Sequence, residues 1–162
     1  MTTTITGAAG INRVADGADM PAGSVLQVVS ASTTTAQTTT STSYVDTGLS
    51  VTITPSSTSS KVKIEFAFTC IHIAANVTAG CSFRIMRDST SLYTPLANHA
   101  FYAAGGLGGS TYRPYMDMAL DSPSTTSAIT YKVQVAGYSS NAVVLNYSSK
   151  FKATIMATEI AG

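Results

Sequence analysis

The sequence predicts an all-β domain, built as a single jelly-roll-like antiparallel β-sandwich that follows an extended N-terminal arm. Two observations lead to this prediction. The chain contains 25 threonines and 21 serines in 162 residues, yet 44% of its residues are hydrophobic. Thr, Val, Ile and Tyr favour strands, whereas Ser, Gly and Asn favour turns. Apolar and polar residues also alternate in several short segments, and none shows the 3.6-residue period of an amphipathic helix.

Length and charge exclude several classes of protein. A chain of 162 residues suits one domain that is large enough to bury a core without metal or disulfides. Charged residues make up only 10% and the net charge is +1, so we expect no nucleic-acid binding. No apolar run approaches the ~20 residues that cross a bilayer, so we expect no membrane insertion. The first residues do not resemble a signal peptide, which predicts cytoplasmic synthesis.

Residues 1–23 are predicted to form the arm, and residues 24–162 the sandwich. The arm has no sustained period of 2 or 3.6 residues, and it contains glycines and a proline between small residues. Terminal segments of this kind are normally mobile unless something holds them. We therefore expect a neighbouring chain to hold the arm. Its spaced apolar residues are the expected contacts: Ile5, Ile11, Val14 and Met20.

The first half of the sandwich contains three predicted strands. Ser24–Ser30 is the first, and the Thr/Ser tract after it is either a loop or an exposed strand. Alternation over Leu49–Ile53 predicts a half-buried second strand. The clearest alternation runs over Lys61–Ile73. One face of this third strand is apolar, which predicts burial on that side. That face consists of Val62, Ile64, Phe66, Phe68 and Cys70.

The second half is predicted to contain six more strands and one long loop. Alternation is expected over residues 81–86, with a short strand at 92–94. Residues 95–111 show no clear strand pattern, include a glycine-rich segment and are predicted to form a loop. Met116, Met118 and Leu120 then alternate with Asp117, Ala119 and Asp121. Further strands are expected at residues 129–135, 143–148 and 151–157. Eight or nine strands fit a two-sheet jelly roll, and a closed barrel is the alternative.

The two cysteines, Cys70 and Cys81, have three possible roles. If Lys61–Ile73 and Cys81–Arg87 form a hairpin, the cysteines lie opposite each other near bridging distance. We favour two small buried hydrophobic side chains, with a disulfide as the second alternative. A metal site formed by the two cysteines and His72 is the third and least favoured. It would have three ligands, whereas structural zinc sites usually need four.

No combination of residues predicts catalysis. The sequence contains two histidines, His72 and His99. It contains no nucleophile elbow of the form Gly-x-Ser-x-Gly whose serine a histidine could activate. Asp16–Asp19 and the pair Asp117 and Asp121 match no EF-hand pattern, so a calcium loop has weak support. We therefore expect no enzyme activity and no cofactor.

Aromatic residues gather in or beside the predicted long loop. Tyrosine-rich loops make good contact surfaces, because Tyr offers a large area at low entropic cost. These rings either contact a receptor, or they cover an oligomer interface or the open end of the sandwich. The candidates are Phe101, Tyr102, Tyr112 and Tyr115.

Three segments carry a resemblance to a known group of proteins. They are MPAGSVLQVVS at residues 20–30, TSYVDTGLSVTITPSSTSSKV at 42–62 and ITYKVQV at 129–135. Together with the opening residues 2–17, they resemble small virion structural proteins and fibre modules of tailed bacteriophages, especially phages of aquatic bacteria. The resemblance implies a non-enzymatic β domain on the outside of the particle, commonly a homotrimer.

The short arm favours one location within such a particle. Tail fibres usually carry long shafts, whereas about 23 residues precede the first predicted strand here. We therefore expect a head decoration (cement) or head-fibre protein on the outer surface of the virion, made in the host cytoplasm. Its expected partners are further copies of itself and the major capsid protein or other virion proteins. The alternative is a tail-fibre or tail-tip module that binds a host surface receptor, such as a glycan.

Overall fold

The computed structural model describes residues 20–162 except 76–77, 94, 97–99, 105–108 and 141, with the backbone alone at 70–75 and 109–111. The regular secondary structure of the described residues consists of strands. These residues include no helix that could span a bilayer. The strands are β1 (Val25–Thr33), β2 (Gln37–Thr39), β3 (Val45–Ile53), β4 (Lys61–Ala75), β5 (Ala79–Arg87), β6 (Thr90–Ser91), β7 (Phe101–Ala103), β8 (Gly109–Asp121), β9 (Ile129–Gly137), β10 (Val143–Leu145) and β11 (Ala153–Ile160).

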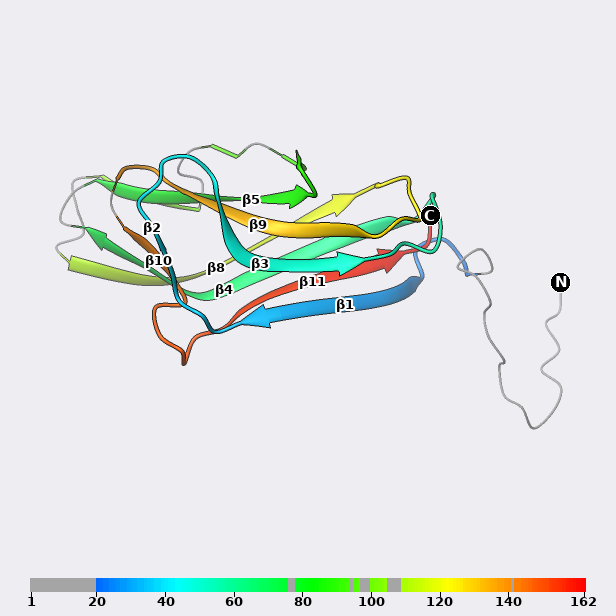
Figure 1. Cartoon of the computed structure of the whole chain (residues 1–162), viewed down its shortest axis with the longest axis horizontal. Coiled ribbons are helices and arrows are strands. Elements are labelled where there is room, and N and C mark those ends of the chain that lie inside the picture. The colour runs from blue at the N-terminus through cyan, green and yellow to red at the C-terminus, as the bar shows by residue number, and fades with distance from the viewer. Residues whose placement is uncertain (1–19, 76–77, 94, 97–99, 105–108, 141) are drawn as a thin grey trace, which may run out of the picture.

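The strands pair into two antiparallel sheets that pack against each other (Figure 1). The first sheet has the order β1-β11-β4-β8, and the short strands β10 and β2 extend it beside the far end of β4. The second sheet has the order β3-β9-β5-β7, with β6 also paired to β5. Two four-stranded sheets connected in this order form a jelly roll, which consists of two Greek keys. The predicted jelly-roll-like sandwich is therefore confirmed.

The core lies between the sheets and is built from alternate residues of each strand. On β4, the predicted inner face is buried from Val62 to Phe68. Phe83 of β5 and Tyr131 of β9 face it from the second sheet, and both are fully buried. The rings of Phe66 and Phe68 lie 5.9 and 5.2 Å from that of Phe83. Each such aromatic pair adds about 0.5–1.5 kcal/mol beyond the burial of its area.

β3 contains a bulge where the sequence Thr47-Gly48 interrupts its pairing with β9. The register shifts between Asp46 and Ser50, and Gly48 has a φ of 72°. That left-handed conformation costs glycine no steric energy. The hydroxyl of Thr47 donates a 2.8 Å hydrogen bond to the carbonyl of Val133, which holds the bulge against β9. The bulge leaves Asp46 at the start of β3 beside the polar residues of β9.

The hairpin of Lys61–Ile73 with Cys81–Arg87, which would place the two cysteines opposite each other, does not form. β4 and β5 are consecutive in the chain, but β4 pairs with β8, β10 and β11, whereas β5 pairs with β6, β7 and β9. Both strands carry an apolar face, and two such faces bury each other best from opposite sheets. The chain therefore crosses from one sheet to the other between these strands.

The loop predicted over residues 95–111 contains strand residues at two places. β7 pairs with β5 at Ala79–Cys81, and β8 already begins at Gly109. A three-residue strand is too short to show a period, and glycine gives no side chain from which to read one. The short strand expected at 92–94 lies earlier, as β6 at Thr90–Ser91. The intervening residues 105–108 are outside the described part of the chain.

Candidate protein-contact face

β8 presents a row of large hydrophobic side chains to the outside of the first sheet. Met116 is 77% exposed, Met118 64% and Leu120 60%. The residues between them, Asp117 and Ala119, are less exposed and lie on the inner side. This is the reverse of what hydrophobicity alone favours, so it needs a structural cause. We call Met116, Met118 and Leu120 the hydrophobic row.

The cause is a set of polar partners that the other sheet and its loops supply to the inner side of β8. The hydroxyl of Tyr131 donates to Asp121 at 2.7 Å, and Nη1 of Arg87 donates to both oxygens of Asp121 at 3.0 Å. The hydroxyl of Tyr93 donates to Asp117 at 2.6 Å. A buried carboxylate is tolerated only when it is paired and hydrogen-bonded. With both aspartates satisfied inside, strand alternation sends the hydrophobic row outward.

The same contacts perturb the two tyrosines. Burial and the hydrogen bond to Asp121 raise the pKa of Tyr131 above its usual range. Burial and the hydrogen bond to Asp117 do the same to the pKa of Tyr93. Both phenols therefore stay protonated and act as permanent donors. Their hydrogen bonds connect β8 to the second sheet and its loops. The two tyrosines have no features of a reaction centre.

The hydrophobic row is one edge of a wider surface, which we call the contact face. Met118 lies opposite Glu65 of β4, and Glu65 lies opposite Met156 of β11. In the next positions Met116, Ala67 and Thr154 form a parallel line across the same strands. A shallow groove of about 370 Å³ lies between these side chains. The contact face consists of Met116, Met118, Leu120, Lys63, Glu65, Ala67, Thr154 and Met156.

The contact face carries one ion pair and no other charged side chain. Nζ of Lys63 lies 2.9 Å from Oε2 of Glu65, and both side chains are about one-third exposed. Such a pair contributes at most about 1 kcal/mol to stability. Its main effect here is that the two charges cancel. The face therefore offers an apolar and electrically neutral surface of several strands' width.

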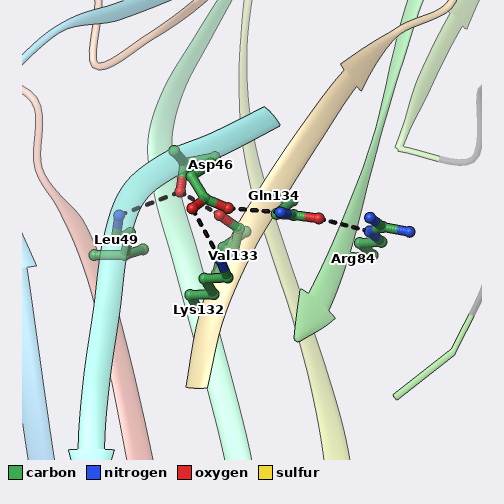
Figure 2. Close-up of polar contacts among 7 residues, drawn as sticks. Asp46, Leu49, Arg84, Lys132, Val133 and Gln134 are labelled. Atoms are coloured by element: carbon green, nitrogen blue, oxygen red, sulfur yellow. Dashed lines mark hydrogen bonds and ion pairs between the residues drawn. The ribbon is translucent and has the colours of Figure 1, made fainter. Parts of the chain in front are cut away.

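The outer face of the second sheet is different in character, because a polar network covers it (Figure 2). Asp46 accepts hydrogen bonds from Nζ of Lys132 at 2.9 Å and from Nε2 of Gln134 at 2.6 Å. Those hydrogen bonds, with that of Lys132 the stronger, lower the pKa of Asp46. Nε of Arg84 donates to Gln134 at 2.8 Å, and its guanidinium lies 4.2 Å from the centre of the Tyr44 ring. This face is satisfied internally and suits solvent.

Two of the four predicted contact aromatics pack inside the domain or against a neighbour. Tyr115 lies on the inner side of β8, and its ring stacks on Phe83 at 4.9 Å. Phe101 of β7 is half-buried, and the guanidinium of Arg113 lies 5.3 Å from its ring centre. Tyr115 therefore belongs to the core packing rather than to a surface loop.

The other two aromatics form separate exposed pairs. Tyr102 is 47% exposed and meets Tyr138 edge to face at 5.1 Å. Tyr112 is 51% exposed and meets Tyr147 edge to face at 5.3 Å. These partners could not be predicted from the sequence, because Tyr138 and Tyr147 follow the ends of other strands, β9 and β10. The four predicted residues thus do not make one continuous surface.

The cysteine prediction is only partly described. Cys81 is fully buried and free, and burial raises its pKa to about 12, so its thiol is protonated and inert. A disulfide is therefore not found at Cys81. The side chains of Cys70 and His72, and all of His99, lie outside the described residues. Within the described part, no three His, Cys, Asp or Glu side chains are grouped to hold a metal ion.

The start of the described chain lies beside the C-terminus (Figure 1). The amide of Gly23 donates to the carbonyl of Ala161 at 2.8 Å, and the amide of Ala161 donates to Ser24 at 2.9 Å. Met20 is half-buried. The other predicted arm contacts, Ile5, Ile11 and Val14, are outside the described residues.

Comparison with known proteins gives likenesses in fold only. No protein-family model matches the sequence, and no curated protein matches it. The chain is similar to part of the T13 particle of infectious bursal disease virus, with a TM-score of 0.44 and 9% identity over 83% of this chain and 35% of that one. It is also similar to the Gx strain structure of that virus, with a TM-score of 0.40 and 14% identity over 86% and 39% of the two chains. The chain thus spans less than half the length of either.

Proposed function

We propose that this chain is a non-enzymatic structural protein of a virus particle, which joins other proteins through the contact face. The observation that carries the proposal is the exposed hydrophobic row on β8. Contiguous exposed apolar side chains on a folded domain mark protein contacts, because leaving them in water is unfavourable. The polar network on the opposite sheet singles out the first sheet as the binding side. Jelly rolls also occur in viral capsids and lectins, although that is an analogy of fold alone.

The kind of particle comes from the sequence resemblance, and we propose a tailed bacteriophage. The chain would lie on the outer surface of the head as a decoration (cement) or head-fibre protein. Residues 1–23 would anchor it to the shell through Ile5, Ile11, Val14 and Met20. The major capsid protein or other virion proteins would be its partners. The resemblance also implies a homotrimer, which stays a prediction.

Copy number tests the location. Quantitative mass spectrometry of purified virions should find hundreds of copies, in simple ratio to the major shell protein. A few copies, in a multiple of three or six, would assign the chain to a fibre or the tail instead. Absence of the chain from purified particles would contradict a virion role altogether.

A receptor-binding role in a tail fibre or tail tip is the second candidate. The exposed pairs Tyr102 with Tyr138 and Tyr112 with Tyr147 favour it, because exposed tyrosine rings can stack on sugars. A glycan array with the purified chain tests this role. Specific binding that is lost in Tyr102→Ala would support it. No signal on the array would favour the structural role.

A further inference from the structure

Four side chains of the contact face lie in symmetrical positions about one line across the sheet, namely Lys63, Glu65, Met118 and Leu120. Ile64 of β4 pairs with Ala119 of β8, and both point inward. Lys63 and Glu65 lie one position to either side of Ile64 on the outer face. Leu120 lies opposite Lys63, and Met118 lies opposite Glu65. The line through Ile64 and Ala119 therefore separates the positive charge of Lys63 from the negative charge of Glu65.

We propose that the contact face binds the same face of a second copy of this chain, about a twofold axis along that line. Such an axis lies between the contact faces of the two copies and runs perpendicular to their strands. Corresponding strands of the two copies therefore run in opposite directions. The axis places Lys63 of each copy over Glu65 of the other. It also places Met118 of each copy over Leu120 of the other. Every contact then occurs twice, as in any isologous interface.

The chemistry of the face suits this occupant. Charges that enter an interface must keep oppositely charged partners, and here each one keeps its partner within the chain and gains a second across the axis. Met118 and Leu120 of one copy would meet Leu120 and Met118 of the other at the usual spacing of about 10 Å between stacked sheets. Methionines adapt their shape to such a contact, because the side chain is unbranched and flexible.

The other surfaces for self-association are less suitable. Within the described chain β8 pairs with β4 alone, so its other edge is open. That edge carries Pro114 and the inward-pointing Asp117 and Asp121, which are the devices that natural sheets use to prevent edge pairing. The outer face of the second sheet would have to desolvate Asp46, Lys132 and Arg84. The contact face would have to desolvate one ion pair, Lys63 with Glu65, and the proposed axis gives each of these charges a second partner.

This inference deepens the proposed function, and it rests on that proposal only in treating the outer face of the first sheet as a protein contact. It is tested on purified protein without particles. A failure here would therefore leave the copy-number experiment on virions unaffected, and a failure there would leave the pairing of two copies unaffected.

The test is the mass of the purified full-length chain in solution, measured by sedimentation equilibrium over a wide concentration range. We expect two copies, or six if a threefold contact also forms. Met118→Asp should raise the dissociation constant at least about 100-fold, because it buries an unpaired charge twice. The matched control is Leu96→Asp, since Leu96 is 78% exposed in the segment between β6 and β7. It should leave the mass unchanged.

Charge reversal tests the axis itself. Lys63→Glu alone should weaken pairing at least about 10-fold, because it brings like charges together. The double variant Lys63→Glu with Glu65→Lys should restore the affinity of the parent chain, since the twofold arrangement is then complementary again. Circular dichroism melting checks that each variant is folded.

Three results would overturn the pairing of two copies through the contact face, and a fourth would overturn its symmetry. One is a full-length chain that is monomeric at every concentration. Another is a trimer whose mass does not respond to Met118→Asp. The third is a monomer that pairs only after residues 1–19 are removed, which would assign the contact face to the arm. A double reversal that fails to restore pairing would reject the twofold arrangement.

Discussion

Two aspartates determine which side of β8 faces the core. Asp121 has a side chain that is 10% exposed, and it holds Arg87 and Tyr131 from the second sheet. We expect Asp121→Asn to destabilise the domain by about 2 kcal/mol, because Arg87 then loses its charged partner in a partly buried site. Urea unfolding measures this change.

A matched control for that variant is Asp46→Asn on the polar outer face. Asp46 also pairs with a cation, Lys132, but its side chain is 53% exposed. We expect this substitution to cost less than about 1 kcal/mol, since water screens exposed ion pairs. Equal losses of unfolding free energy at the two positions would show that Asp121 does not hold the two sheets together.

Glu159 of β11 makes stability depend on pH. It is fully buried and accepts hydrogen bonds from the amide and hydroxyl of Ser56 at 2.6 and 2.7 Å, and from Gln27 at 2.6 Å. Burial acts to raise its pKa, but the hydrogen bonds from Gln27 and Ser56 outweigh it, so the pKa lies below its ordinary value. The carboxylate therefore stabilises the fold fully above the unfolded pKa of about 4.3. That contribution is lost as the pH falls through the folded pKa.

Glu159→Gln tests this dependence. At pH 7 the variant should be less stable by about 1–3 kcal/mol, because donors to the charged carboxylate lose their acceptor. Towards pH 3 the difference should shrink, because the unfolded parent chain takes up a proton at Glu159 below its pKa of about 4.3, whereas the lowered pKa disfavours that proton in the folded chain. Urea unfolding at both pH values measures it. A difference that stays constant with pH would mean that folding does not shift the pKa of Glu159.

At the scale of the strands, alternation predicts position well and orientation less well. β4, β5, β9 and β11 were predicted to within three residues of their observed bounds, because each shows several apolar–polar repeats, whereas only the second half of β3 was predicted. Alternation on β8 also indicates two faces. It does not say that the methionine side is outside, because Arg87, Tyr93 and Tyr131 satisfy the aspartates from distant parts of the sequence. For the same reason the strands that pair with β4 and those that pair with β5 could not be derived from the local pattern of either strand.

The orientation of β8 gives an element-scale prediction. If the hydrophobic row is truly outside, the double variant Met116→Thr, Met118→Thr should change the stability of the dilute chain by no more than about 0.5 kcal/mol. Phe66→Ala on the neighbouring strand should cost about 3–5 kcal/mol, because Phe66 is 2% exposed. Thermal or urea unfolding compares the two. A large loss in the methionine variant would place that side of β8 in a core.

At the scale of the whole molecule, the point where the proposed arm joins the domain lies near the contact face, and we propose separate tasks for the two. The arm joins the domain where Gly23 bonds to Ala161, at the end of the first sheet that also holds Leu120 and Lys63. Anchoring by the arm and pairing by the face would thus act side by side on one end of the domain. Because the face is built only from residues after Gly23, its pairing does not require the arm.

Removal of residues 1–19 separates the two tasks. The shortened chain keeps every described strand and the bond from Gly23 to Ala161, so it should fold and still pair as the parent does. It should no longer join particles that lack this protein, because it lacks Ile5, Ile11 and Val14, which we propose as the anchoring contacts. Mass spectrometry of re-sedimented particles counts the bound copies.

The matched variant for this experiment is the full-length chain with Met118→Asp, which should show the opposite behaviour. It keeps the arm and therefore the means to join a particle, but its contact face carries an unpaired charge. Binding to particles should persist with reduced occupancy, since each copy then binds without the support of its neighbour. If the shortened chain still joins particles and Met118→Asp does not, the contact face is the anchor and the arm is not.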